Sequence, residues 1–281
     1  MLAVLTSPVF LVVALGSALL AASAGAIGCI SVIRGQSLIG DAIGNAAFPG
    51  VVLAFMLTLT RDPLILVLGA ATSGLVGFYT VQILSGKSKL SLDSSLAIVL
   101  TSFFGLGMVL KSHITGNVDY MQASQAGLQN YIFGQASYMM EKDVLAIAVI
   151  GGLSLLIVIL FFKELQLYTF DETLATTFGY KKPIMDALVL LATVFLIAVG
   201  LKVVGAILIS AMLITPCVIA QQYTNNFKKL LIIAALSAAV SAFIGVWIAT
   251  ALDGIATGPA IIVVMSTIAL ISIAINQKGR H

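Results

Sequence analysis

Long apolar runs follow one another along the whole sequence and are separated by short polar stretches. A helix needs about twenty apolar residues to cross the hydrocarbon core of a bilayer. The runs are continuously apolar, whereas strands of a membrane β-barrel would alternate apolar and polar positions. The pattern therefore predicts an all-α polytopic membrane protein. The predicted spans are residues 9–33, 42–60, 63–84, 93–111, 143–162, 184–200, 203–222, 230–252 and 259–275.

The stretch 184–222 leaves the number of spans open between eight and nine. It crosses the membrane twice only if the chain turns tightly around Gly200, Lys202 and Gly205. Dividing it there gives nine spans in a single transmembrane domain over residues 1–281. Two longer polar segments interrupt the spans, an outer one over 112–142 and an inner one over 163–183.

The composition narrows the function classes. Hydrophobic residues make up 60% of the chain and charged residues 9%, whereas soluble domains are about a quarter charged. This excludes a soluble enzyme, a secreted scaffold and a disordered linker. The basic residues are scattered, so nucleic acid is not an expected partner. Cys29 and Cys217 both lie in apolar runs, where we expect them to act as packing residues.

The positive charges predict the orientation, because cytoplasmic loops carry an excess of Lys and Arg. A cytoplasmic C-terminus leaves only Arg61, Lys111, Lys142 and Lys202 on the outer side. The opposite orientation would place ten basic residues outside and four inside, and it is rejected. With nine spans the N-terminus then lies outside. The ten basic residues placed on the inner side are Arg34, Lys87, Lys89, Lys163, Lys181, Lys182, Lys228, Lys229, Lys278 and Arg280.

The inner polar segment predicts a short amphipathic helix over 170–179. Thr169 is its expected N-cap, and Asp171 and Glu172 lie in the first turn, where they suit the helix dipole. Gly179 is suited to end the helix. Apolar residues recur on one face at positions i, i+4 and i+8. The residues predicted to form this helix and to contact a partner are Phe170, Asp171, Glu172, Leu174, Ala175, Phe178 and Gly179, of which Phe170, Leu174 and Phe178 form the apolar face.

Two interpretations of this segment remain open. An amphipathic helix can lie on lipid headgroups, or its apolar face can dock into a groove on a cytoplasmic partner. We favour docking. The sequence SGKSKL at residues 85–90 lacks the earlier glycine of a phosphate-binding loop, and no other nucleotide motif is present. If ATP drives the protein, another subunit must bind it.

The segment RGQSLIGDAIGNAAFPGVVLAF, residues 34–55, contains candidate ligands. Asp41 lies at or just inside the membrane, where an ionised group is costly and indicates function. Asn45 follows one helical turn later on the same face, and the two side chains offer oxygen ligands for a hard divalent cation. Pro49 and Gly50 are expected to interrupt the helix near a pore and free backbone carbonyls. The alternative is that Asp41 caps a helix at the cytoplasmic boundary.

GQSLIGDAIGNAAFPGVVLAF resembles the signature of permease subunits of bacterial manganese, zinc and iron ABC importers. That signature usually reads Ser-Leu-x-Gly-Asp-Ala-x-Ser-His-Ala-x-x-Pro-Gly. FDETLATTFGY, from residue 170, and VVGAILISAMLITPCVIAQ, residues 203–221, resemble two further segments of the family in the same order. The resemblance implies a permease dimer, two cytoplasmic ATPase subunits that bind ATP, and an extracellular metal-binding protein. It also implies that Asp41 and Asn45 coordinate the metal and that the inner segment is the coupling helix.

The sequence departs from that signature at the histidine, which is replaced by Asn45. An amide oxygen is a weak ligand, so a symmetric pair of these chains would hold a transition metal poorly. The chain has two histidines, His113 in the outer segment and His281 at the tail. We therefore expect a second permease subunit, a paralogue that retains the histidine. The outer residues His113, Asp119, Glu141 and Asp143 could form an external metal-delivery site or a solvated face.

The predicted function is that of a permease for divalent metal ions in the bacterial cytoplasmic membrane. Manganese is the favoured cargo, followed by zinc and iron, and no permanently bound cofactor is expected. The alternative is a secondary transporter driven by an ion gradient, which would favour further intramembrane carboxylates. An intramembrane enzyme ranks last, because the sequence shows no nucleophile–base or metal-ligand constellation.

Overall fold

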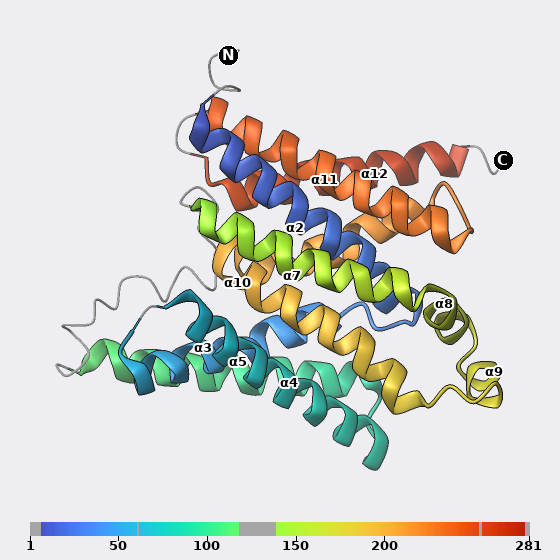
Figure 1. The fold of residues 1–281 in the computed structure, drawn as a ribbon, viewed down its shortest axis with the longest axis horizontal. Coiled ribbons are helices and arrows are strands. Elements are labelled where there is room, and N and C mark those ends of the chain that lie inside the picture. The colour runs from blue at the N-terminus through green and yellow to red at the C-terminus, as the bar shows by residue number, and fades with distance from the viewer. Residues whose placement is uncertain (1–6, 61, 118–138, 253–254, 279–281) are drawn as a thin grey trace. The chain divides into compact units, whose positions relative to one another are not determined.

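The computed structural model describes residues 7–60, 62–117, 139–252 and 255–278. Its elements are all helices, and no strand occurs in these ranges (Figure 1). They are α2 (Pro8–Ile33), α3 (Ile39–Thr58), α4 (Pro63–Lys87), α5 (Leu92–Gly116), α7 (Glu141–Leu160), α8 (Phe162–Phe170), α9 (Glu172–Thr177), α10 (Lys182–Gln221), α11 (Phe227–Ala251) and α12 (Thr257–Lys278).

The prediction of nine spans is confirmed for the described part of the chain. Nine helical segments there are long and apolar enough to cross a membrane, and α10 supplies two of them, Lys182–Leu201 and Val203–Gln221. The helix geometry of α10 breaks at Gly205, which has φ 79° and ψ 168°. This conformation is essentially restricted to glycine. A single glycine therefore marks the predicted division.

The helices form two compact units. Of the described residues, the first contains 7–37, 139–196, 211–252 and 255–278, and the second contains 38–60, 62–117 and 197–210. In the first unit α2 packs against α7, α8 and α11, and α11 also packs against α12. In the second unit α3 packs against both α4 and α5. About two thirds or more of the most apolar stretches of α2 and α3 is buried inside the protein, 67% and 72% respectively.

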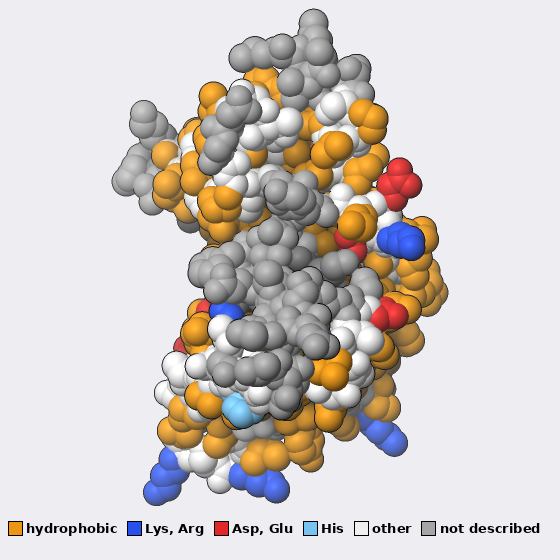
Figure 2. Space-filling view, turned by 90° about the vertical axis from the view of Figure 1, so that its left-hand side faces the viewer, with side chains coloured by type: hydrophobic (Ala, Val, Ile, Leu, Met, Phe, Trp, Pro, Cys, Tyr) orange, Lys and Arg blue, Asp and Glu red, His pale blue; other side chains and the backbone are white. Residues whose placement is uncertain are grey.

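The outward faces of several helices are apolar. Only 22% of the most apolar stretch of α7 and 28% of that of α12 is buried inside the protein. Large side chains such as Leu64, Leu153 and Leu270 are more than half exposed. Hydrophobic side chains cover much of the described surface in Figure 2, with few Lys, Arg, Asp or Glu side chains among them. Such a surface is suited to lipid and not to water.

Candidate functional site

The first candidate site lies in the second unit, at the start of α3. Asp41 is in the first turn of this helix, and its carboxylate oxygen Oδ1 accepts a hydrogen bond from the amide Nδ2 of Asn45 at 3.1 Å. The same nitrogen donates to the backbone carbonyl of Asp41 at 2.9 Å. The predicted juxtaposition of the two side chains is therefore present. Both side chains are half-buried.

Ser210 is a third member of this site that the sequence analysis missed. Its hydroxyl donates to Asp41 Oδ1 at 3.3 Å and to the carbonyl of Ala206 at 2.7 Å. Ser210 lies in α10, 169 positions further along the chain, so sequence spacing carries no signal of the contact. Because both amide hydrogens of Asn45 are directed at Asp41, the Asn45 amide oxygen remains as an acceptor. The arrangement presents carboxylate, amide and hydroxyl oxygens together.

The alternative in which Asp41 caps the helix is not the arrangement observed. Leu38 occupies the N-cap position of α3, and no side chain caps this end. Asp41 lies three residues further on, where the helix dipole still favours an anion. Its carboxylate bonds to Asn45 and Ser210 instead of to the end of the helix.

The prediction that Pro49 and Gly50 interrupt α3 is wrong, because the helix continues through both. Proline lacks an N–H group, so the carbonyl of Asn45, four residues earlier, loses its usual helical donor. The Ser73 hydroxyl of α4 donates to the carbonyl of the adjacent residue Ala46 at 2.6 Å. This bond and the packing of α3 against α4 hold the helix beside the proline.

Gly50 serves close packing instead of a helix break. A Cβ at this position would collide with the carbonyl of Gly69 and with the Cβ of Ser73, both on α4. Its hydrogen atom therefore allows the backbones of α3 and α4 to approach each other. This contact fixes α3, and with it Asp41, within the second unit.

The second candidate site is the inner segment, where the single predicted helix is wrong in detail. The structure has two helices, α8 and α9, at the end of α7, and neither is a candidate span (Figure 1). Thr169 is buried within α8 and donates to the carbonyl of Leu165 at 2.6 Å. The N-cap of α9 is Asp171, whose carboxylate accepts from the Leu174 N–H at 2.8 Å. Asp171 therefore takes the capping role expected of Thr169.

The end of α9 agrees with the sequence prediction. Gly179 has φ 92°, and the Gly179 and Tyr180 N–H groups donate to the carbonyls of Thr176 and Ala175. This pair of bonds is the Schellman arrangement that ends helices at glycine. Ala175 is fully buried against Tyr168 and Met185, so it anchors α9 and does not face a partner.

Three apolar residues of the inner segment are exposed. Phe170 is 58% exposed, Leu174 44% and Phe178 70%. Phe170 also packs edge-on against Phe227 of α11, with the ring centroids 5.7 Å apart. Exposed large apolar residues outside the spans indicate an interaction surface.

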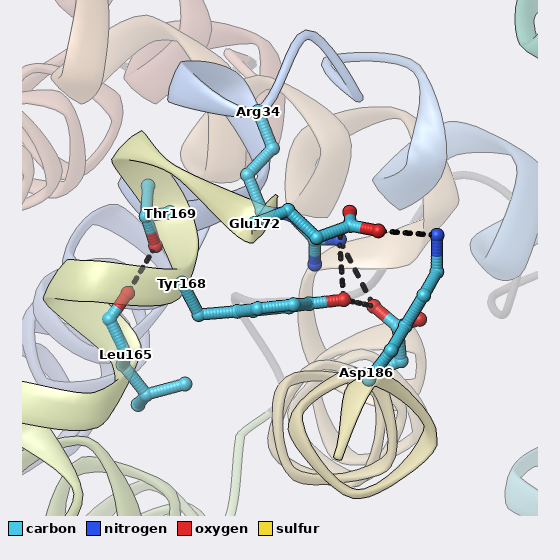
Figure 3. A network of polar contacts seen from close by, with 7 residues as sticks. Arg34, Leu165, Tyr168, Thr169, Glu172 and Asp186 are labelled. Carbon is cyan, nitrogen blue, oxygen red and sulfur yellow. Dashed lines mark hydrogen bonds and ion pairs between the residues drawn. The ribbon is translucent and has the colours of Figure 1, made fainter. Parts of the chain in front are cut away.

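A polar network holds the inner segment to α2 and α10 within the first unit (Figure 3). The Arg34 guanidinium donates to Asp186 at 2.9 Å and to the Tyr168 hydroxyl at 3.2 Å, and lies 4.4 Å from the Tyr168 ring centroid. Glu172 of α9 lies 3.8 Å from Arg34 and also pairs with Lys182. The Arg34 and Asp186 side chains are only 9% and 11% exposed. From sequence alone Arg34 is predicted only as a charge on the inner face, and this role in the network carries no local signal.

Tyr168 is the buried centre of the network. Burial and the hydrogen bond that its hydroxyl donates to Asp186 at 2.8 Å raise the pKa of Tyr168, against the opposing charge of Arg34. The hydroxyl therefore stays protonated at physiological pH and continues to donate to Asp186. The Tyr168 hydroxyl and the buried pair of Arg34 and Asp186 join α8 and α10 to the end of α2. Glu172 adds α9 through its pairs with Arg34 and Lys182.

The predicted external metal-delivery site stays a prediction. Asp119 lies outside the described residues, His113 lies in the last turn of α5, and Glu141 and Asp143 lie in the first turn of α7. Within the described ranges no three His, Cys, Asp or Glu side chains gather as metal ligands.

The described helices form a polytopic helical membrane protein with an oxygen-rich polar site in α3. Residues 7–276 match the ABC 3 transport family, and the chain belongs to this family. The resemblance inferred from the sequence motifs is thereby confirmed.

Two relatives are similar in sequence to this chain over nearly its whole length. The chain is 39% identical to the zinc transport system membrane protein TroC of Treponema pallidum, covering 95% of this chain and 89% of that protein. It is 38% identical to the manganese transport system membrane protein MntC of Bacillus subtilis, covering 94% of this chain and 60% of that longer protein. Among solved structures, PsaBC from Streptococcus pneumoniae matches with a TM-score of 0.84 and 28% identity, over 97% of this chain and 95% of that chain.

Proposed function

We propose that this chain is the membrane-spanning permease subunit of an ATP-driven importer of divalent transition metal ions, with manganese as its main cargo. The observation that carries the proposal is the Asp41 carboxylate, held by Asn45 and Ser210 in a chain of the ABC 3 transport family. An ABC family implies ATP as the energy source, which argues against the ion-gradient alternative. ATP hydrolysis falls to two separate cytoplasmic ATPase subunits, because the sequence has no complete nucleotide motif.

The ligands that this chain itself supplies favour manganese over zinc. Asp41, Asn45 and Ser210 offer only oxygen atoms, and carboxylate, carbonyl and water oxygens suit manganese. Zinc prefers imidazole and thiolate ligands. The names of the relatives include both metals, so the donor atoms are the feature that separates them.

One chain supplies too few ligands for a complete site. Manganese takes about six oxygen ligands, and Asp41 and Asn45 supply only two strong candidates. We therefore propose that a second permease subunit completes the pore, and that this subunit is a paralogue with histidine at the position of Asn45. A homodimer that is stable and transports metal with the ATPase would contradict the heteromeric assembly.

The inner segment is proposed to couple the pore to the ATPases. Phe170, Leu174 and Phe178 are exposed outside the spans, as expected for a surface that docks into a groove of a partner. Phe178→Ala should uncouple the transporter: ATP hydrolysis persists while metal uptake falls by about tenfold, the scale of losing one buried aromatic anchor. Tyr79→Ala, which removes an equally exposed aromatic residue from the span α4, is the control.

The proposed orientation places the inner segment in the cytoplasm together with the C-terminus. Within the first unit Arg34 and Lys182 flank Glu172, and Lys163 and Lys228 line one groove beside α8. These basic residues come from four helices and gather around the same segment. This clustering supports a cytoplasmic location by the positive-inside rule. An extracellular metal-binding protein would then deliver cargo from the opposite side.

The direct test is co-purification of this chain with its ATPase, followed by reconstitution into vesicles. The proposal expects uptake of manganese that requires ATP and exceeds uptake of zinc at equal concentration. Uptake that persists without ATP but requires a proton or sodium gradient would overturn it.

A further inference from the structure

A groove lies in the first unit beside α8, and its cavity volume is about 750 Å³. The residues of its two walls are spaced i, i+3, i+4 and i+7, and one wall crosses from the end of α7 into α8. One wall consists of Leu155, Val158, Ile159 and Phe162 of α7 and α8, and the other of Lys228, Leu231, Ile232 and Ala235 of α11. The helices α7 and α11 each pack against α2, whose small residue Ala26 lies in the lining between them. The groove is therefore a gap between two membrane helices.

The groove is apolar along its length and charged at one end. Lys163 and Glu164 of α8 and Lys228 of α11 lie at the charged end, and both lysines are exposed. Ala235 lies seven residues from Lys228, which is about 10 Å along a helix. The lining thus offers ammonium groups next to about 10 Å of apolar wall.

We propose that this groove binds one anionic phospholipid of the inner leaflet. The phosphate lies between Lys163 and Lys228, and an acyl chain lies along the apolar walls of α7 and α11. Basic pockets between helices on the cytoplasmic side of a membrane are suited to anionic headgroups. The leaflet assignment rests on the orientation in the proposed function, whereas the choice of an anionic lipid rests on the two lysines.

The residues at the charged end of the groove favour an anionic lipid over a zwitterionic one. Lys163 and Lys228 outnumber Glu164, so the rim carries a net positive charge. The Glu164 side chain can accept a hydrogen bond from a hydroxyl of a glycerol headgroup, and the amide oxygen of glutamine can accept the same bond. A phosphatidylethanolamine amine would also pair with Glu164, so the variant Glu164→Gln separates the two lipids. It should weaken retention of the zwitterionic lipid but not of the anionic one.

The bound lipid contacts the base of the inner segment. Phe162 lines the groove and packs on Phe227, with the ring centroids 5.5 Å apart. Phe227 in turn packs on Phe170, with the ring centroids 5.7 Å apart. An acyl chain against Phe162 therefore supports the aromatic cluster from which Phe170 projects. The lipid is inferred to stabilise the inner segment, which is proposed to dock on the ATPase.

The test is native mass spectrometry of the intact transporter after delipidation and exposure to vesicles of phosphatidylcholine with phosphatidylglycerol, or with phosphatidylethanolamine. The wild-type protein should retain one phosphatidylglycerol per copy of this chain. Lys163→Gln and Lys228→Gln should each lower that retention about fivefold, the scale of losing one basic contact to an anionic membrane. Lys229→Gln is the matched control, because Lys229 does not line the groove.

Equal loss with Lys229→Gln, or equal retention of all three lipids, would overturn the proposal. Preferential retention of phosphatidylethanolamine that Glu164→Gln abolishes would overturn it in favour of a zwitterionic lipid. The readout is lipid mass and does not require transport. A transporter that retains the lipid but fails to carry metal would therefore refute the proposed function alone.

Discussion

The buried ion pair between Arg34 and Asp186 makes a quantitative prediction about the inner segment. Asp186→Asn keeps the shape of the side chain and an oxygen acceptor for Tyr168, but it leaves Arg34, only 9% exposed, without its close anionic partner. Removing one partner of a buried pair costs about 3 to 5 kcal/mol. Because both side chains retain some exposure, we expect about 3 kcal/mol, the lower end of that range.

The assay is reversible unfolding by titration with a denaturing detergent, together with the ratio of metal transported to ATP hydrolysed. Lys182→Gln is the control: it breaks only the pair with Glu172, whose side chains are 57% and 41% exposed, and exposed pairs contribute less than about 1 kcal/mol. Asp186→Asn should also lower the transport ratio, because Arg34, which pairs with Glu172 of α9, is no longer held to α10 by its ion pair. Equal stability losses in the two variants would refute the reasoning.

Three smaller predictions concern packing and the polar site. Ser210→Ala should weaken metal binding about tenfold, because a hydrogen bond to a charged group contributes about 1.5 to 3 kcal/mol; competition with manganese in a binding assay measures this. Gly50→Leu should destabilise the protein by at least about 1 to 3 kcal/mol through collision with α4, whereas Gly86→Leu, with open space around it, should not; unfolding titration separates them. Gly205→Ala should cost about 1 to 3 kcal/mol in the same titration, compared with Gly152→Ala, because alanine strains at φ 79°.

The spans were predictable from sequence because a membrane helix must satisfy its own backbone and face lipid over its whole length. The composition of each run therefore carries the information locally. The same locality explains the confirmed contact between Asp41 and Asn45, which are one helical turn apart. It also explains why Gly179 could be identified as the end of α9, since the signal lies in the residue itself.

The errors arose where local signals compete or where distant segments meet. Thr169 and Asp171 are both good N-caps, and burial of Thr169 decides the choice in favour of Asp171. Pro49 usually ends a helix, but packing against α4 allows α3 to continue. Ser210 meets Asp41 only through the tertiary fold. No local pattern distinguishes such a serine from others in apolar runs.

The exposed apolar face of the inner segment could be predicted only in part. The spacing of Phe170, Leu174 and Phe178 predicted an apolar face, and all three are exposed. Ala175 fits the same segment by sequence, yet it is buried against Tyr168 and Met185. Which small residue anchors a short helix depends on the neighbours that the fold supplies.

The central claim is that the Asp41 carboxylate contacts the transported metal. The most direct measurement is ATP-dependent uptake of radioactive manganese by vesicles that contain the complete transporter. Three versions of this chain are compared: the wild type, Asp41→Asn and the control Asp62→Asn. The control alters an exposed N-cap of α4. The account predicts that Asp41→Asn abolishes uptake while the assembly with the ATPase and its basal hydrolysis persist, and that Asp62→Asn transports normally. Undiminished manganese uptake by the Asp41→Asn transporter would contradict the account.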